Sequence, residues 1–196
     1  MSVVRERMAD AAALLLARDG YHATSFSAVL EESGAPRGSI YHHFPAGKDE
    51  LVSAALARQA TRVIGGLARL EGRDPERVVD RFAAWWRAGL ERSDFAVGCS
   101  LVAVTTSAGP GELRGEAGAL FAQWLDRLAG LFERAGVAAP TAASFATQLL
   151  ASIEGAVVIS RAQGTFAAFD TVVERLRAEA RALPSTTVRP TKETDV

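Results

Sequence analysis

Apolar residues recur every three or four positions along most of this chain, a spacing typical of α-helices that bury one face. One such stripe comprises Val4, Met8, Ala11 and Leu15. Glycine and proline interrupt the pattern at intervals and mark the ends of successive helices. Residues 97–106 are dense in β-branched side chains and resemble a strand, but we interpret them as a short helix. The sequence therefore predicts an all-α protein of about nine helices.

The composition limits the classes of protein to which the chain can belong. With 196 residues, 48% of them hydrophobic, it can build a substantial core. The formal net charge is −1, so overall basicity cannot attract nucleic acid, and any DNA contact must come from a local patch. The single cysteine and three histidines lack the clustering of a zinc site, and we expect no metal and no cofactor.

The two ends of the chain differ in character. Near the start, Arg18 and Asp19 interrupt the apolar run, so the pattern is neither that of a signal peptide nor that of a membrane span. We therefore expect a cytoplasmic protein with no membrane partner. At the other end, residues 184–196 are polar and have no apolar spacing to bury, which predicts a disordered tail.

Residues 24–44 have the pattern of two short helices joined by a tight turn. Thr24 or Ser25 can cap the first helix. Its apolar face would comprise Phe26, Val29 and Leu30. Gly34 can adopt the left-handed conformation that ends a helix, and Pro36 stands where a second helix would begin. Two short helices in this order form a helix-turn-helix, a motif by which proteins read DNA.

The second helix of this motif, at residues 37–44, would bury Ile40 and Phe44. Its outward residues would then be Arg37, Gly38, Ser39, Tyr41, His42 and His43. They combine a forked donor, small residues that permit close approach, and hydroxyl and imidazole groups that reach bases and phosphates. No acid occurs between Gly34 and Lys48. Lys48 and the amides that open the next helix could clamp a phosphate.

This part of the chain, residues 5–55, resembles the tetracycline-repressor (TetR) family of bacterial transcription regulators. The positions that match the family's motif are Gly20, Tyr21, Thr24, Ser25, Val29, Gly34, Gly38, Ile40, Tyr41, His42, Phe44, Lys48, Glu50 and Leu51. An extra residue before Lys48 resembles the LmrA/YxaF-like subgroup, to which residues 98–104 and 152–162 are also similar. By this resemblance, the residues that contact DNA are Thr24, Ser25, Arg37, Gly38, Ser39, Tyr41, His42 and Lys48.

The rest of the chain carries no motif of an enzyme class. It has no phosphate-binding loop or nucleophile elbow, and no histidine follows His43, so we expect no enzymatic activity. Taken one at a time, its many aromatic rings are most simply core residues. In a family that encloses ligands between these helices, however, they indicate a pocket for a small-molecule effector. The residues predicted to line it are Phe82, Trp85, Trp86, Phe95, Cys99, Phe121, Trp124, Phe145 and Glu154.

Glu154 lies within an apolar run, where an ionised carboxylate is costly to bury without a partner. It could pair with Arg161 or with a backbone group, or it could face a second copy of the chain. Alternatively, it could bind a cation or hydroxyl group of the ligand. Cys99 is most simply a small buried residue.

These features predict a helix-turn-helix domain at 1–48, a ligand-binding and dimerisation domain at 49–183, and the tail. The last two helices, near 141–163 and 166–183, have broad apolar faces with small residues, which suit a homodimer interface. The predicted function is repression of transcription, with release from operator DNA by an apolar or aromatic molecule. The alternatives are an activator, a helical interaction protein that no longer reads DNA, and an enzyme on a helical scaffold.

Overall fold

The computed structural model describes residues 3–68, 74–107 and 111–184, and these residues form nine α-helices and no β-strand. The helices are α1 (Val3–Ala23), α2 (Phe26–Ser33), α3 (Ser39–His43), α4 (Lys48–Ala68), α5 (Pro75–Arg92), α6 (Ser100–Thr106), α7 (Gly111–Arg134), α8 (Ala139–Gln163) and α9 (Ala167–Ala182). The all-α prediction is confirmed, and the β-branched run contains helix α6. From residue 185 onward, the predicted tail lies outside the described residues.

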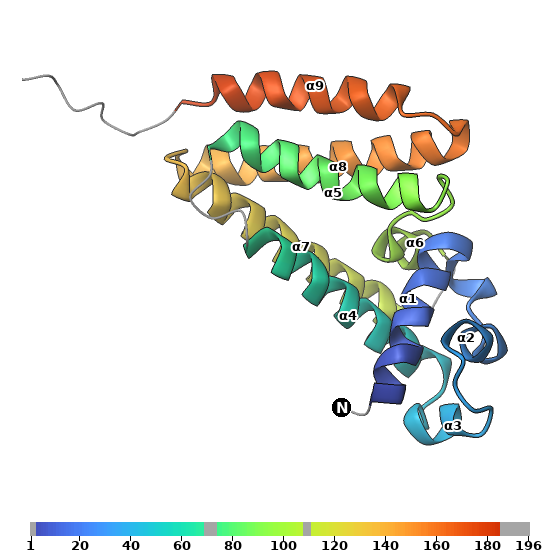
Figure 1. Ribbon diagram of the computed structural model, residues 1–196. Helices are drawn as coiled ribbons and strands as arrows, with labels where there is room; N and C mark the ends of the chain where they lie inside the picture. Colours follow the sequence, from blue (N-terminus) through green and yellow to red (C-terminus); the bar gives the residue numbers. More distant parts are fainter. Residues whose placement is uncertain (1–2, 69–73, 108–110, 185–196) are drawn as a thin grey trace, which may run out of the picture.

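Helices α1, α2 and α3 gather at one end of the molecule, and α4 leads from them into the larger group of helices (Figure 1). Helix α1 is the centre of the smaller group, since it packs against α2 and α3 as well as against α4 and α6. In the larger group, α7 packs against α4, α6 and α8, and α9 packs against α5 and α8. Helix α4 therefore belongs to both groups, because it contacts α1 as well as α7.

Local sequence explains where several of these helices begin and end. Helix α5 starts at Pro75 after Asp74, whose carboxylate accepts a hydrogen bond from the Arg77 amide at 2.9 Å. Gly164, which has a left-handed φ of 64°, caps the end of α8. A side chain would be strained at that φ, so glycine permits the tight turn into α9.

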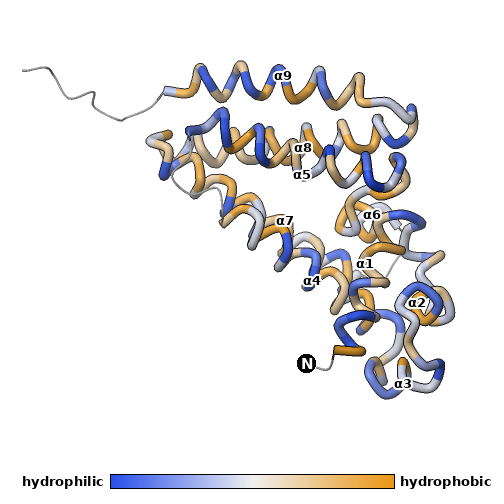
Figure 2. Tube along the Cα trace, in the orientation of Figure 1, coloured by the Kyte–Doolittle hydropathy of each residue, from blue (hydrophilic) through white to orange (hydrophobic). Residues whose placement is uncertain are grey.

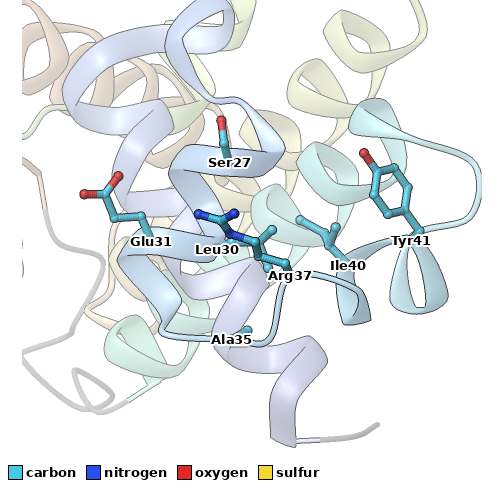
Figure 3. A pocket seen from close by; sticks show the side chains of 7 residues that line it. All are labelled: Ser27, Leu30, Glu31, Ala35, Arg37, Ile40 and Tyr41. Carbon is cyan, nitrogen blue, oxygen red and sulfur yellow. The ribbon is translucent and has the colours of Figure 1, made fainter.

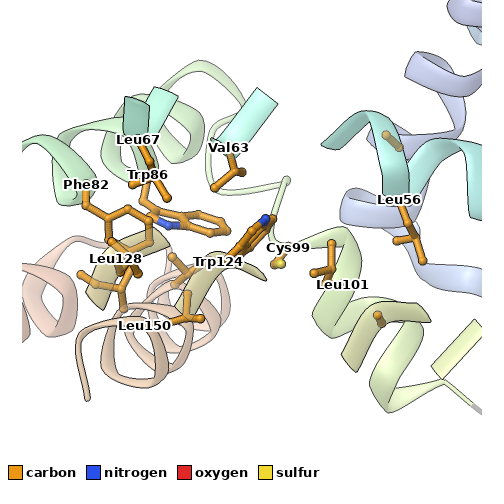
Figure 4. Packing of buried hydrophobic residues seen from close by; sticks show 14 of the residues in the cluster. Leu56, Val63, Leu67, Phe82, Trp86, Cys99, Leu101, Trp124, Leu128 and Leu150 are labelled. Carbon is orange, nitrogen blue, oxygen red and sulfur yellow. The ribbon is translucent and has the colours of Figure 1, made fainter. Parts of the chain in front are cut away.

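One continuous hydrophobic core joins the two groups of helices. It includes Met8 and Leu16 of α1, Leu56 of α4 and Trp124 of α7, all of them fully buried. Figure 4 shows part of this core, where Trp124 and a second indole lie among leucine and valine side chains of neighbouring helices. In Figure 2, hydrophobic and hydrophilic residues alternate around the helices, as expected when each helix buries one face.

Candidate nucleic-acid interface

The turn between α2 and α3 is built by hydrogen bonds that are local in sequence. The Ser25 hydroxyl caps α2 by accepting a hydrogen bond from the Ala28 amide at 3.2 Å. Gly34, whose φ of 62° is left-handed, caps the end of α2, and the Ser39 amide then donates to the Pro36 carbonyl at 3.0 Å. The predicted helix-turn-helix is therefore present, with an α3 of only five residues.

Two arginines of α1 hold this motif from behind. Arg5 donates a hydrogen bond to the His43 carbonyl, and Arg7 donates to the Ser33 carbonyl. Arg5 also forms an ion pair with Glu50 at 3.2 Å. These contacts fix the ends of α2 and α3 and the start of α4. Sequence reasoning missed them, because the partners are separated by 26 to 45 positions and leave no periodic signal.

The outward side of α3 and of the residues just before it carries most of the predicted DNA contacts. The exposed residues there are Arg37, Gly38, Tyr41 and His42. Tyr41 is 68% exposed, and its ring packs edge-on against Phe26 at 5.4 Å between centroids. Ser39 is half-buried, and Ile40 faces the protein and is fully buried. This segment therefore has one face in the core and one face available to a partner.

A groove of about 820 Å³ opens between α2 and α3 (Figure 3). Its lining residues are Ser27, Leu30, Glu31, Ala35, Arg37, Ile40 and Tyr41. Figure 3 shows Arg37 and Tyr41 on either side of Ile40, with Ser27 and Glu31 on the neighbouring helix. These two α2 residues were not among the predicted site residues. Their four-residue spacing places them on one helix face, which is the signal that could have found them.

Two of the predicted DNA-contacting residues are turned toward the protein. Thr24 is fully buried, and its hydroxyl donates to the Gly20 carbonyl at 2.9 Å. The Lys48 ammonium donates to the Tyr21 carbonyl at 2.6 Å and lies 4.1 Å from the centroid of that ring, and burial lowers the pKa of Lys48. The Tyr21 hydroxyl donates to Asp49 at 2.6 Å, and burial together with this carboxylate raises the pKa of Tyr21 to about 12. These side chains fasten α1 to the starts of α2 and α4.

The residues predicted to line one effector pocket are distributed over two cavities and the core. Phe82 and Trp85 line a cavity of about 310 Å³ between α4 and α5. Cys99 and Glu154 line another, of about 330 Å³, between α1, α6 and α8.

The remaining predicted rings pack in aromatic pairs. The pairs and their centroid distances are Phe95 with Phe166 at 4.7 Å, Phe121 with Trp124 at 5.7 Å, Phe132 with Phe145 at 5.0 Å, and Trp85 with Trp86 at 4.9 Å. Such edge-on or tilted pairs stabilise a core beyond the area that they bury.

Buried polar atoms without partners are found in the larger group of helices. Within the described part of the chain, they include the indole nitrogens of Trp86 and Trp124 and both carboxylate oxygens of Glu154. Glu154 is 8% exposed, and burial raises its pKa to about 7. Arg161, which the sequence offered as a partner for Glu154, donates instead to backbone carbonyls. Cys99 is buried, as predicted.

Helix α8 leaves a face of small and apolar residues exposed in the single chain. The residues are Ala143, Thr147, Ala151, Gly155, Val158, Ile159 and Ala162. Among the described helices, α8 is the one that is long and apolar enough to cross a membrane, yet half of its apolar window is buried inside the fold. Small side chains on the outer face permit close approach of another helix.

Two family models match the chain. The model described as bacterial regulatory proteins, tetR family, matches residues 9–55. The model described as transcriptional regulator LmrA/YxaF-like, C-terminal domain, matches residues 75–175. The first match covers most of α1, all of α2 and α3, and the start of α4, and the second extends from α5 into α9.

Individual proteins are similar over most of the chain. An HTH-type transcriptional regulator of Mycobacterium tuberculosis is 34% identical over 180 residues, which are 88% of this chain and 92% of the relative. LmrA of Bacillus subtilis, also an HTH-type transcriptional regulator, is 28% identical over 160 residues, 80% of this chain and 85% of LmrA. The solved structure of the regulatory protein TetR from Rhodobacter sphaeroides has a TM-score of 0.80 at 21% identity, covering 90% of this chain and 98% of that one.

Proposed function

This chain belongs to the TetR family of bacterial transcriptional regulators, and on that premise we propose that it is a repressor which an apolar or aromatic small molecule releases from operator DNA. It is a DNA-binding regulator and not an enzyme. The resemblance inferred from its N-terminal motif is confirmed by the family matches. We further propose that it works in the cytoplasm as a homodimer.

The proposed mode of DNA reading rests on the outward face of α3 and the residues just before it. Arg37 and Tyr41 project on either side of the buried Ile40, and no acid occurs between residues 34 and 48. An arginine can bind guanine through two parallel hydrogen bonds, and a tyrosine hydroxyl can bind a phosphate oxygen. This stretch itself contributes no carboxylate that would repel the DNA backbone, whereas Glu31 of the neighbouring α2 lines the same groove.

Two copies are proposed to pair through α8 and α9. The exposed α8 face supports this arrangement, because Val158 and Ile159 are 51% and 46% exposed in the single chain. A two-fold pairing buries the same patch on both copies. It would present two α3 helices to half-sites one helical turn apart, about 34 Å, or a multiple of that distance.

The effector is proposed to act through α4. At the start of this helix, Lys48 and Glu50 hold α1. Near its end, Val63, Gly66 and Leu67 line the cavity beside α5. A molecule bound in that cavity would therefore displace the same rigid element that positions the helix-turn-helix. Coupling of about 1–3 kcal/mol would change DNA affinity roughly 5- to 150-fold, and DNA would weaken effector binding by the same factor.

Fluorescence anisotropy with DNA from the chain's own promoter tests the reading face. Combining Arg37→Ala with Tyr41→Ala should weaken binding roughly 30-fold or more, since each such contact contributes about 1–3 kcal/mol. The variant should also show a shallower dependence of affinity on salt, because the positive charge of Arg37 beside the DNA backbone is lost. Arg114→Ala removes an exposed arginine of α7 and serves as the control. Parent-like affinity in the double variant would refute the assignment.

A further inference from the structure

The second cavity, of about 330 Å³, lies between α1 of the smaller group of helices and α6 and α8 of the larger group, and we call it the junction cavity. Helix α1 contributes Ala17, α6 contributes Val102, and α8 contributes Glu154 and Val157, while Cys99 directly precedes α6. It shares no lining residue with the cavity beside α5. Its volume lies at the lower end of the range that small ligands occupy, about 300–1,000 Å³.

Glu154 is the feature of the junction cavity that the fold leaves unexplained. Both of its carboxylate oxygens are covered, and neither accepts an ordinary hydrogen bond from any residue that the structure describes. The Cys99 thiol is a weak donor, and its contact offsets only part of the rise in the pKa of Glu154. Burying a carboxylate without a partner is unfavourable, so the folded chain retains a cost that a ligand could remove.

The other charged residues that line the junction cavity are Arg18 and Arg161, and both have partners. Arg18 forms ion pairs with Asp19 at 2.9 Å and with Glu32 at 3.9 Å. Arg161 donates hydrogen bonds to three backbone carbonyls. Glu154 is the one acid among the described residues that line the cavity. Because both arginines are bound to other groups, no cation of the cavity is paired with it.

We propose that the junction cavity binds a small molecule that carries a protonated amine, whose ammonium group donates hydrogen bonds to the Glu154 carboxylate. The valine and alanine side chains of the cavity would contact its hydrocarbon part. A cation complements this site because it compensates the buried negative charge, whereas a neutral hydroxyl group leaves that charge in place.

This ligand class has a pH signature. An ammonium group binds the ionised carboxylate, so its affinity should fall below a pH of about 7, the pKa of Glu154, by a factor approaching tenfold per pH unit. The other titratable or charged groups at the cavity do not change charge in this range. Burial holds the pKa of Cys99 well above its usual value, and guanidinium groups in proteins keep their charge across this range.

A ligand in the junction cavity would touch both domains, and its effect on DNA rests on the proposed function. Arg161 donates to the Arg18 carbonyl of α1 at 3.1 Å. The amide of Gly98, just before α6, donates to the Ala17 carbonyl at 2.9 Å. All four residues line the cavity. Occupation of the cavity should therefore bias the spacing of α1 and α6, and with it the affinity for DNA.

Isothermal titration calorimetry on the full chain at slightly alkaline pH tests the binding step. The probes are n-butylamine, benzylamine and 2-phenylethylamine, each measured beside the alcohol of the same shape. We expect at least one amine to bind roughly 10- to 100-fold more tightly than its alcohol. Glu154→Gln keeps the shape but removes the charge and should abolish this preference. Glu116→Gln, at an exposed acid of α7, should retain it.

Several outcomes would overturn the proposal. They are no binding of any of the three amines, equal affinities for amine and alcohol, and unchanged amine binding by the Glu154→Gln protein. If that variant does not fold, the affinity of the parent for the amine is measured across a range of pH. An affinity that falls below neutral pH supports the assignment, and an affinity that stays constant across neutral pH contradicts it.

A separate arm measures promoter DNA affinity with and without the amine that binds. We expect the amine to change the DNA affinity of the parent but not that of the Glu154→Gln variant. If the amine leaves the DNA affinity of the parent unchanged, the proposed coupling between the cavity and DNA binding is wrong. The protein with Arg37→Ala and Tyr41→Ala retains every residue of the junction cavity. It should bind the amine as the parent does, so a failure of DNA reading and a failure of the cavity can be told apart.

Discussion

The Arg161 guanidinium of α8 binds the main chain near the end of α1, where its Nη2 atom donates to the Arg18 carbonyl at 3.1 Å. The same atom donates to the Ala96 carbonyl at 2.8 Å, in the segment between α5 and α6. One side chain of α8 therefore connects α1 with the segment between α5 and α6, although the three segments are distant in sequence.

Arg161→Met should loosen this connection. Hydrogen bonds from a charged donor are lost, and we expect the free energy of unfolding to fall by about 1–3 kcal/mol. Hydrogen exchange followed by mass spectrometry should increase most near Arg18, at the end of α1. Arg175→Met, at an exposed arginine of α9, is the matched control. Native-like protection at the end of α1 would contradict the role of Arg161.

Gly98→Ala should disturb the same contact by a different route. A Cβ atom at position 98 would lie 2.5 Å from Nη1 of Arg161, so the guanidinium group would have to move. The substitution should therefore destabilise the parent but have little further effect in the Arg161→Met background. A double-mutant cycle in urea measures this coupling. Additive effects of the two substitutions would show that the residues act independently.

Glu154 should make the folded chain less stable at neutral and alkaline pH than at acidic pH. Its pKa is about 7 in the fold and 4.5 when unperturbed, so the folded state holds this proton more tightly, and the associated stability is lost as the pH rises through 7. Glu154→Gln should match the parent below pH 4.5 and exceed its stability above pH 7 by about 3 kcal/mol. Urea unfolding across this range measures the difference, which must grow with pH.

Cys99 should be protected from thiol reagents in the folded protein. Burial, followed by the neighbouring Glu154, raises the pKa of its thiol well above the ordinary value, so little reactive thiolate is present. Because Cys99 is the single cysteine of the chain, Ellman's reagent reports on it alone. We expect slow reaction in buffer and prompt reaction in denaturant. Fast stoichiometric labelling of the native protein would be inconsistent with this burial.

Ile159→Glu should weaken the proposed dimer. Two-fold pairing would bury the new carboxylate in an apolar face, and we expect the dissociation constant to rise roughly 100-fold. Sedimentation equilibrium measures the change, and circular dichroism verifies that the helices persist. Thr105→Glu places the same charge at an exposed position of α6 and should leave self-association unchanged. A dimer equally stable in both variants would place the interface elsewhere.

The helical architecture could be predicted because burial leaves a periodic trace in the sequence. Val29, Ile40 and Phe44 were predicted to face inward, and all three are fully buried. The secondary structure of the β-branched run at 97–106 was harder to predict, since such side chains favour strands when considered alone. In the fold, Leu101 and Val104 of this run are buried where α6 packs against α1 and α7, and tertiary packing favours the helix.

The candidate site could be predicted only in outline, because periodicity indicates which face is buried but not which neighbour covers it. Lys48 has the charge of a phosphate ligand, yet its ammonium group lies on Tyr21, 27 positions away. Phe82 and Phe145 are both buried but lie in different places: Phe82 lines the cavity between α4 and α5, and Phe145 packs against Phe132. The burial of Glu154 followed from its apolar neighbours, whereas its lack of a partner depends on where Arg161 points.

One core runs from α1 to α9 and includes Val29 and Ile40 of the helix-turn-helix, so we expect the integrity of α1–α3 to depend on the packing of α4–α9. A chain with such a core is expected to unfold cooperatively, as one unit. A cavity created in α8, for example by Leu149→Ala, would then reduce the population of intact recognition surfaces without altering one atom of α3. In a living cell, the effect of such a distant substitution could be told apart from a defect in the recognition of DNA sequence only by measuring the abundance of the protein.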